Sequence, residues 1–182
     1  RHDAGKHMSL PVVGDAKSSL ASLTQALDYT GPAEWVSDAQ AERRKWDAYV
    51  AGNVAVGNGP HSYAQAIGVI NDLCEPRDRV VAAAGGLPAE VTANWRTLDI
   101  GTVDVEFGFS CMGYEIAGAW GARIAQSERE PNQDTITFCG DGSYMMLNSD
   151  IYSSVLTAKK LIVLVLDNGG FAVINKLQTN TG

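Results

Sequence analysis

Two short apolar segments, residues 135–139 and 161–166, each run directly into a polar turn that contains glycine. The segments are rich in β-branched and aliphatic side chains and are bounded by turn residues, a pattern that predicts buried strands. In open parallel α/β sheets, ligands bind beyond the carboxyl ends of the strands. We therefore expect Asp141 and Asn168, which follow these segments 27 positions apart, to converge on one spot above a sheet.

The side chains in these two turns suit a hard cation such as Mg²⁺. Asp141 offers a carboxylate oxygen, Asn168 offers an amide oxygen, and Gly169 and Gly170 allow a main-chain carbonyl to turn toward the same ion. Proteins commonly bind Mg²⁺ through one or two carboxylates and leave other positions to phosphate oxygens and water. The sequence therefore predicts a site for Mg²⁺ that carries a diphosphate.

The residues around Asp141 favour a phosphate next to that ion. Gly140 and Gly142 let the backbone approach a ligand closely. Backbone N–H groups from Ser143 onward can hold a phosphate at the start of the next helix. Each turn taken alone is most simply an ordinary turn, whereas the pair at two strand ends is more specific. Neither the dinucleotide fingerprint nor the phosphate-loop motif occurs in the chain.

From residue 61 onward, predicted helices and strands alternate, which indicates an α/β fold with a parallel sheet and helices on both faces. We predict strands over 79–84, near 100–107, over 135–139 and 161–166, and helices over 62–73, 89–96, 112–126 and 146–158. Residues 30–60 predict a linker that contains a helix. A strand over 10–15 and an amphipathic helix after it predict that residues 1–29 are the C-terminal tail of a preceding domain. Because only three or four strands are predicted, we expect the domain of residues 61–182 to be incomplete at its C-terminus.

The composition counts against several classes of function. A net charge of −7 argues against a nucleic-acid partner, and the longest aliphatic run, residues 161–166, is too short to cross a membrane. Cys74, Cys111 and Cys139 show no metal-ligand spacing and are expected to be small, reduced residues of the core. The N-terminal residues lack an initiator Met and the apolar core of a signal peptide, so we expect a cytoplasmic protein cut at that end.

The turn after residue 139 resembles a known cofactor motif. Gly140-Asp141-Gly142 followed by Asn168 is similar to the motif of thiamine diphosphate-dependent enzymes of the acetolactate synthase-like family, with Asp167 where the family often has a first Asn. The resemblance implies that residues 61–182 are the pyrophosphate-binding domain of such an enzyme. It also implies that Asp141, Asn168 and the carbonyl of Gly170 hold Mg²⁺, which in turn holds the diphosphate of the cofactor.

A second segment, Ser110-Cys111-Met112-Gly113-Tyr114, resembles the family segment that runs beneath the thiazolium ring. There, an apolar side chain at the Met112 position supports the bent form of the cofactor. By itself, Met112 would be interpreted as a side chain that fills a gap in a core. The two segments together extend the resemblance to a set of residues that would contact thiamine diphosphate. This set is Gly86, Ser110, Met112, Gly140, Asp141, Gly142, Ser143, Asn168, Gly170 and Phe171.

The flanking residues narrow the resemblance to one branch of the family. Residues 105–118, 140–148 and 167–175 are similar to the trihydroxycyclohexane-1,2-dione hydrolases of myo-inositol catabolism. This branch implies a homodimer or homotetramer that opens a cyclic diketone by C–C cleavage to 5-deoxyglucuronate. The family's activating glutamate comes from an N-terminal pyrimidine-binding domain, so no catalytic residue is assigned in this chain. The chain alone is therefore expected to have no turnover.

Three alternatives remain open. An acetohydroxyacid synthase or related carboligase would carry Gly-Gln-His where this chain has Gly86-Leu87-Pro88. A Mg²⁺-dependent phosphotransferase of the haloacid-dehalogenase type would need a second Asp at position 143, which is Ser. The third alternative is a non-catalytic interaction module. Glu106 is expected to be a solvated or capping carboxylate, with a contact to substrate as its alternative role.

Overall fold

The computed structural model describes residues 6–181. The chain divides into two compact units between residues 45 and 46, inside helix α3 (Ala33–Val54). In the first unit, helix α2 (Ala16–Ala26) begins after Asp15, whose carboxylate accepts a hydrogen bond from the backbone N–H of Ser18 at 2.8 Å. The domain boundaries predicted near residues 29 and 60 stay predictions.

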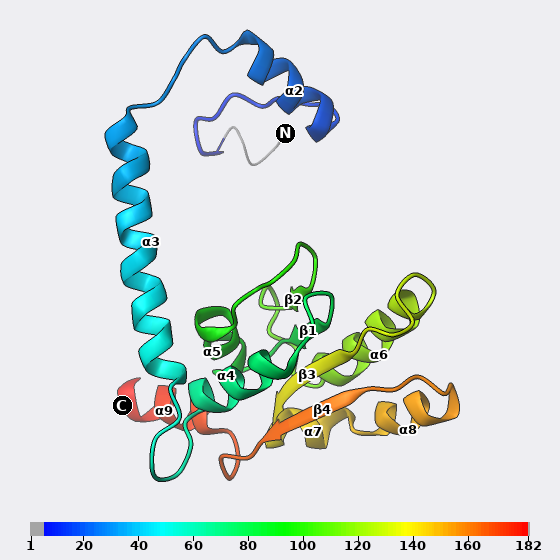
Figure 1. Cartoon of the computed structure of the whole chain (residues 1–182). Helices are drawn as coiled ribbons and strands as arrows, with labels where there is room; N and C mark the ends of the chain where they lie inside the picture. Colours follow the sequence, from blue (N-terminus) through cyan, green and yellow to red (C-terminus); the bar gives the residue numbers. More distant parts are fainter. Residues whose placement is uncertain (1–5, 182) are drawn as a thin grey trace. The chain divides into compact units, whose positions relative to one another are not determined.

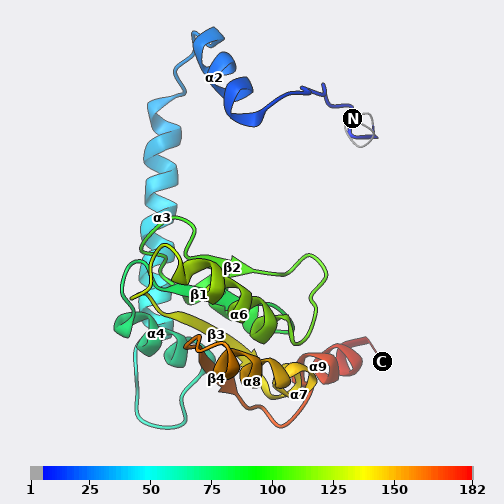
Figure 2. The ribbon, with the colours of Figure 1, turned by 90° about the vertical axis from the view of Figure 1, so that its right-hand side faces the viewer.

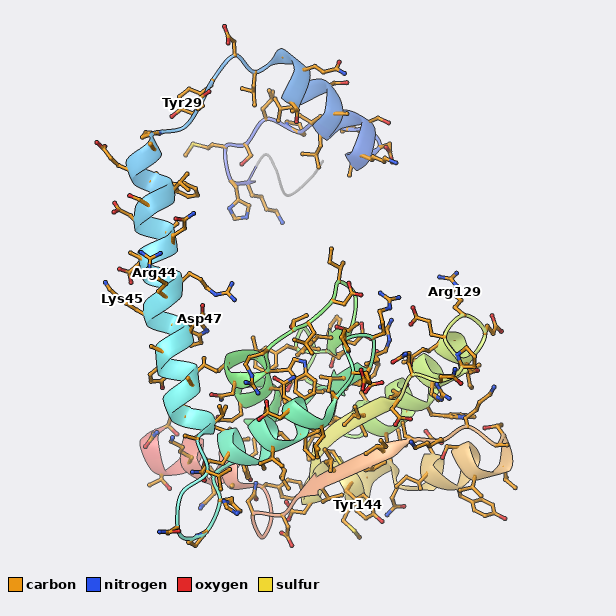
Figure 3. All side chains as sticks on the ribbon, viewed as in Figure 1. Tyr29, Arg44, Lys45, Asp47, Arg129 and Tyr144 are labelled. Carbon is orange, nitrogen blue, oxygen red and sulfur yellow. The ribbon has the colours of Figure 1, made fainter. Side chains whose placement is uncertain are left out.

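The side chains of α3 are exposed along most of its length. Figure 3 shows Arg44, Lys45 and Asp47 projecting from this helix. Lys45 forms an exposed ion pair with Glu42, one turn earlier, at 2.6 Å. Surface pairs of this kind contribute little to stability.

The prediction of a strand over residues 10–15 is wrong, since the structure shows no strand there. Leu10 and Val12 are 89% and 76% exposed. A strand is stable only when neighbouring strands satisfy its backbone N–H and C=O groups. All four strands of the described chain belong to the second unit, so this segment has no partner in its own unit.

The second unit is built on a four-stranded parallel sheet, as predicted. The strands are β1 (Arg79–Ala82), β2 (Val103–Val105), β3 (Thr135–Gly140) and β4 (Ile162–Leu166). They lie in the order β2-β1-β3-β4, and each neighbouring pair is parallel. Figure 2 shows the four strands one below the other in this order. All four predicted strands are confirmed to within a few residues.

Helices cover both faces of this sheet, which confirms the predicted α/β class (Figures 1 and 2). The helices of this unit, besides the end of α3, are α4 (Tyr63–Leu73), α5 (Leu87–Asn94), α6 (Tyr114–Ser127), α7 (Asp141–Leu147), α8 (Ser149–Leu156) and α9 (Ala172–Thr181). On β3, Ile136 and Phe138 join the core formed with α4 and α5. The alternate side chains, Thr135 and Thr137, hydrogen-bond to α6 on the other face. This alternation is the period of two expected for a strand covered on both sides.

The helix predicted near 146–158 is confirmed as α8. A separate short helix, α7, precedes it, beginning directly after β3 at Asp141 and ending before the break at Asn148. Gly140 keeps an extended backbone, with ψ of 162°, so the chain turns from strand to helix within one residue. An acidic residue such as Asp141 is also favourable in a first helical turn. Helix α9 was not predicted.

The order of the strands creates a crevice between β1 and β3. Through α5 the chain passes from β1 to β2 on one side, and through α6 it returns to β3 on the other side of β1. In α/β sheets, ligands bind at such a reversal, outside the carboxyl ends of the strands. The fold therefore predicts a ligand site next to the segments that follow β1 and β3.

Candidate functional site

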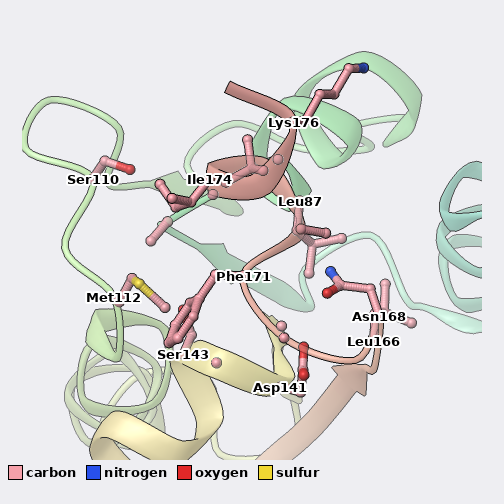
Figure 4. A pocket seen from close by; sticks show the side chains of 18 of the residues that line it. Leu87, Ser110, Met112, Asp141, Ser143, Leu166, Asn168, Phe171, Ile174 and Lys176 are labelled. Carbon is pink, nitrogen blue, oxygen red and sulfur yellow. The ribbon is translucent and has the colours of Figure 1, made fainter. Parts of the chain in front are cut away.

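A cavity of about 510 Å³ lies at the carboxyl ends of the strands. Its walls come from the segments that follow β1, β3 and β4, from Ser110 and Met112 after β2, and from α9 (Figure 4). All ten predicted contact residues lie in this lining: Gly86, Ser110, Met112, Gly140, Asp141, Gly142, Ser143, Asn168, Gly170 and Phe171. A volume in this range suits a small organic molecule. The contacts of these residues with a ligand stay a prediction.

Asp141 carries an unsatisfied oxygen in this lining. Its Oδ1 atom is buried and has no hydrogen-bond partner among the described residues. A buried polar atom without a partner costs about 1–3 kcal/mol, and native proteins contain few of them. A cation bound in the cavity would remove this cost.

Asn168 presents its amide in one orientation. The Nδ2 group donates a hydrogen bond to the Tyr63 hydroxyl at 2.8 Å, and no donor to Oδ1 is found among the described residues. In Figure 4 the amide oxygen lies on the side of Asp141 and the nitrogen on the other side. The carboxylate and the amide oxygen are therefore on the same side of the molecule, as expected from their strand ends.

The loop that carries Asn168 is shaped by its neighbours. Asp167 accepts a hydrogen bond from the backbone N–H of Gly169 at 2.8 Å, a local turn that aspartate forms readily. Gly169 and Gly170 have φ of 79° and 137°, values that favour glycine. The aspartate at position 167 thus serves as a turn-forming residue, a role that could have been inferred from its place two residues before Gly169.

Glu106 holds the loop that contains Ser110. One carboxylate oxygen accepts from the N–H of Phe109 at 2.8 Å and the other accepts from the N–H of Cys111 at 3.0 Å. The bond from Cys111, followed by the bond from Phe109, lowers the pKa of the Glu106 carboxyl below its usual 4.5. These two bonds confirm the expected capping role, whereas the alternative contact with a substrate stays untested.

Glu115 is a buried carboxylate to which the sequence assigned no role. It is 1% exposed, and it accepts hydrogen bonds from the backbone N–H of Ala84 at 3.0 Å and of Gly113 at 2.8 Å. Ala84 leads from β1 into the cavity wall, and Gly113 directly follows Met112 and precedes α6. The carboxylate therefore joins two segments that line the cavity. An acidic residue among the apolar positions of α6 was the only sequence signal for it.

The described residues contain no group of three or more His, Cys, Asp or Glu side chains that could hold a metal ion by themselves. A divalent ion in the cavity would rely on one carboxylate together with amide, carbonyl and ligand oxygens, which is a common arrangement for Mg²⁺. Within the described part of the chain, no helix has the length and apolar character needed to cross a membrane.

Comparisons with known proteins identify relatives of this chain. Residues 83–182 match the family model described as "Thiamine pyrophosphate enzyme, C-terminal TPP binding domain". A curated 3D-(3,5/4)-trihydroxycyclohexane-1,2-dione hydrolase from Geobacillus thermodenitrificans is 31% identical over 98% of this chain and 31% of its own length. Another from Bacillus cereus, numbered 1, is 45% identical over 64% of this chain and 17% of its own. The chain thus spans less than a third of these relatives.

Among solved structures, a benzoylformate decarboxylase from Polynucleobacter necessarius has a similar fold, with a TM-score of 0.61. The similarity covers 69% of this chain and 23% of the decarboxylase chain. At 16% sequence identity, this similarity supports the α/β fold alone.

Proposed function

Since the chain belongs to the thiamine pyrophosphate enzymes, we propose that its second unit binds thiamine diphosphate (thiamine pyrophosphate) through Mg²⁺. We further propose that the whole protein opens the ring of 3D-(3,5/4)-trihydroxycyclohexane-1,2-dione by C–C cleavage to 5-deoxyglucuronate. The observation that carries the proposal is the buried Oδ1 of Asp141, which has no partner in the described chain and lines the cavity.

Three features of the cavity fit Mg²⁺, and a fourth shapes its apolar wall. Asp141 has a carboxylate oxygen without a partner, and the amide nitrogen of Asn168 is engaged elsewhere, which leaves its oxygen for a cation. The positive φ of Gly170 allows its carbonyl to turn toward the same ion. Gly142, which has no room for a Cβ atom beside Phe171 and Met112, lets these side chains pack directly against α7.

In this proposal, each group of the chain has a defined task. Asp141, Asn168 and the Gly170 carbonyl hold the ion, while Met112 and Phe171 form an apolar wall that supports the organic part of the ligand. Glu106 and Glu115 hold the loops of that wall in place through backbone hydrogen bonds. When bound, the cofactor supplies the nucleophilic carbon needed to break a C–C bond next to a carbonyl.

The choice of a hydrolase over a synthase rests on the names of the relatives and on one part of the lining. Leu87, which lines the cavity where synthases carry a polar side chain, offers only carbon. Pro88 is buried in the first turn of α5. We also propose that the whole protein acts in the cytoplasm as a homodimer or homotetramer, with its three cysteines as free thiols.

Calorimetry on the 182-residue chain tests the cofactor site. We expect saturable binding of thiamine diphosphate that requires Mg²⁺. Asp141→Asn and Asn168→Ala should each weaken this binding at least about tenfold, a loss comparable to one charge-assisted contact. Asp150→Asn, in the first turn of α8 and outside the cavity lining, is the matched control. Binding that is unaffected by Asp141→Asn would contradict the proposed site.

The unfolding free energy provides a second check on Asp141. Because its Oδ1 has no hydrogen bond to lose, Asp141→Asn should lower the unfolding free energy by no more than about 1 kcal/mol, the contribution of an acidic residue in the first turn of a helix. For the whole protein, an assay with the cyclic dione and with pyruvate distinguishes the hydrolase from a synthase. Product formation from pyruvate alone would show that the substrate assignment is wrong.

A further inference from the structure

We propose that Tyr63 is the residue that orients Asn168 for cation binding, by fixing which end of its amide faces the cavity. The inference rests on the proposed function, because it gives Asn168 a role as a metal ligand. The observation behind it is the hydrogen bond from Asn168 Nδ2 to the Tyr63 hydroxyl at 2.8 Å, which joins residues 105 positions apart.

Tyr63 is held rigidly by the start of α4. It is the first residue of this helix and follows the N-cap Ser62, whose hydroxyl accepts from the N–H of Gln65 at 3.2 Å. The Gln65 side chain accepts in return from the N–H of Ser62 at 2.9 Å and donates to the carbonyl of Ala55 at 2.8 Å. Such a capping box fixes the first turn of a helix.

The ring of Tyr63 is fixed as well. It packs against the hydrophobic core that α4 and α5 share with the sheet, while its side chain lines the cavity. A side chain with an anchored ring and a fixed helical position has a hydroxyl in a defined place. Tyr63 is therefore a stable reference point for the exposed, glycine-containing loop after β4.

A tyrosine hydroxyl can accept from the amide nitrogen or donate to the amide oxygen, and here it accepts, which leaves the Asn168 oxygen free. The last torsion of an asparagine side chain is broad and roughly two-fold, so an unrestrained amide readily exchanges its oxygen and nitrogen. An amide nitrogen carries two donor hydrogens and cannot bind a cation, whereas the oxygen can. By accepting from Nδ2, the Tyr63 hydroxyl holds the oxygen on the side of Asp141 (Figure 4).

Tyr63→Phe isolates this effect, because it keeps the ring and removes only the hydroxyl. In calorimetric titrations of Mg²⁺ into the 182-residue chain at saturating thiamine diphosphate, we expect the affinity for Mg²⁺ to fall roughly 2- to 10-fold, the worth of one hydrogen bond. Tyr152→Phe, at a 67% exposed position on α8 outside the cavity lining, is the matched control and should leave the affinity unchanged.

A double-mutant cycle separates positioning from general structural damage. If Tyr63 acts only through Asn168, Tyr63→Phe should have no further effect in the Asn168→Ala background. An equal loss of Mg²⁺ affinity in both backgrounds would overturn the inference. A measurement that keeps the hydroxyl uses 3-fluorotyrosine at position 63 in the otherwise unchanged chain. Its ¹⁹F signal should shift when Asn168→Ala is introduced, because that variant removes the donor to the Tyr63 hydroxyl, and a signal that does not move also overturns the inference.

The Asp141→Asn variant distinguishes the two proposals. If this variant loses binding while Tyr63→Phe binds Mg²⁺ as well as the wild type, the role of Tyr63 is wrong and the cofactor site stands. If Asp141→Asn binds as the wild type does, the cofactor site itself is wrong, and the role of Tyr63 fails with it.

Discussion

Gly142 lies so close to Phe171 that a Cβ atom at position 142 would stand 2.7 Å from Cε1 and 3.0 Å from Cδ1 of the ring. The same atom would lie 3.2 Å from the terminal methyl carbon of Met112. Gly142 is in the first turn of α7, and Phe171 follows the glycine pair after β4. The absence of a side chain at 142 thus allows segments after β2, β3 and β4 to meet in one cavity wall.

Gly142→Ala should weaken the binding of thiamine diphosphate and Mg²⁺ at least about tenfold without unfolding the protein. Alanine gains up to about 1 kcal/mol of helix propensity over glycine, whereas moving the ring and the methionine costs about 1–3 kcal/mol. The two effects partly cancel in the unfolding free energy, so binding is the sensitive measurement. Displaced Phe171 and Met112 side chains would change the space that the ligand needs.

The control for this variant is Gly121→Ala in α6, where the added Cβ would meet no atom within 4 Å apart from its chain neighbours and the backbone of its own helix. It should raise the unfolding free energy by about 0.5–1 kcal/mol, because glycine is unfavourable inside a helix, and leave binding unchanged. Equal affinities for Gly142→Ala and Gly121→Ala would show that the close packing at position 142 does not matter for the ligand.

Glu115→Ala should lower the unfolding free energy of the 182-residue chain by about 2–5 kcal/mol, because it leaves two buried N–H groups, of Ala84 and Gly113, without acceptors. Glu115→Gln keeps one acceptor oxygen and should lose less. Urea denaturation followed by circular dichroism measures both values. Glu128→Ala, at the exposed C-terminal end of α6, is the control and should change stability by less than about 0.5 kcal/mol. A similarly small change for Glu115→Ala would contradict the structural role of this carboxylate.

Glu106 should make the stability of the protein depend on pH in the acid range. Its pKa is lower in the folded chain than its usual 4.5, because the N–H groups of Cys111 and Phe109 bind the charged carboxylate. This stabilisation is fully present above pH 4.5 and is lost as the pH falls through the lowered folded-state pKa. Glu106→Gln should therefore melt at a lower temperature than wild type near neutral pH. The difference should disappear in acid, and a difference that is independent of pH would argue against this cause.

The three cysteines should differ in reactivity, because the prediction that all of them lie in the core is wrong for Cys111, which is exposed. Burial, with a smaller contribution from the Glu115 carboxylate, raises the pKa of the Cys139 thiol to about 12. Burial, together with Asp78 and Asp134, raises that of Cys74 to about 11. Because the thiolate is the reactive form, Ellman's reagent at mildly alkaline pH should react first with exposed Cys111. The fast phase should be absent in Cys111→Ser. Rapid labelling of Cys139 in the native protein would contradict its burial.

Much of the fold could be predicted from residues close together in the sequence. The strands over 135–139 and 161–166 are short apolar segments followed by turns that contain glycine, and these local signals do not depend on distant contacts. Ser62 and Gln65 form a capping box, which is likewise a pattern of four consecutive residues. The segment 10–15 shows the limit of such patterns, because a strand also needs a partner that its own residues cannot supply.

The sequence by itself determined the alternation of helices and strands and the chemistry of Asp141 and Asn168, because strand length, glycine ends and side-chain type are local properties. Only the tertiary structure decided that Tyr63 meets Asn168 across 105 positions and that Glu115 joins Ala84 to Gly113. The close approach of Phe171 to Gly142 is likewise a contact between distant residues that only the tertiary structure reveals. These contacts depend on how α4, α6 and the loop after β4 pack on the sheet, and that packing is set by the core as a whole.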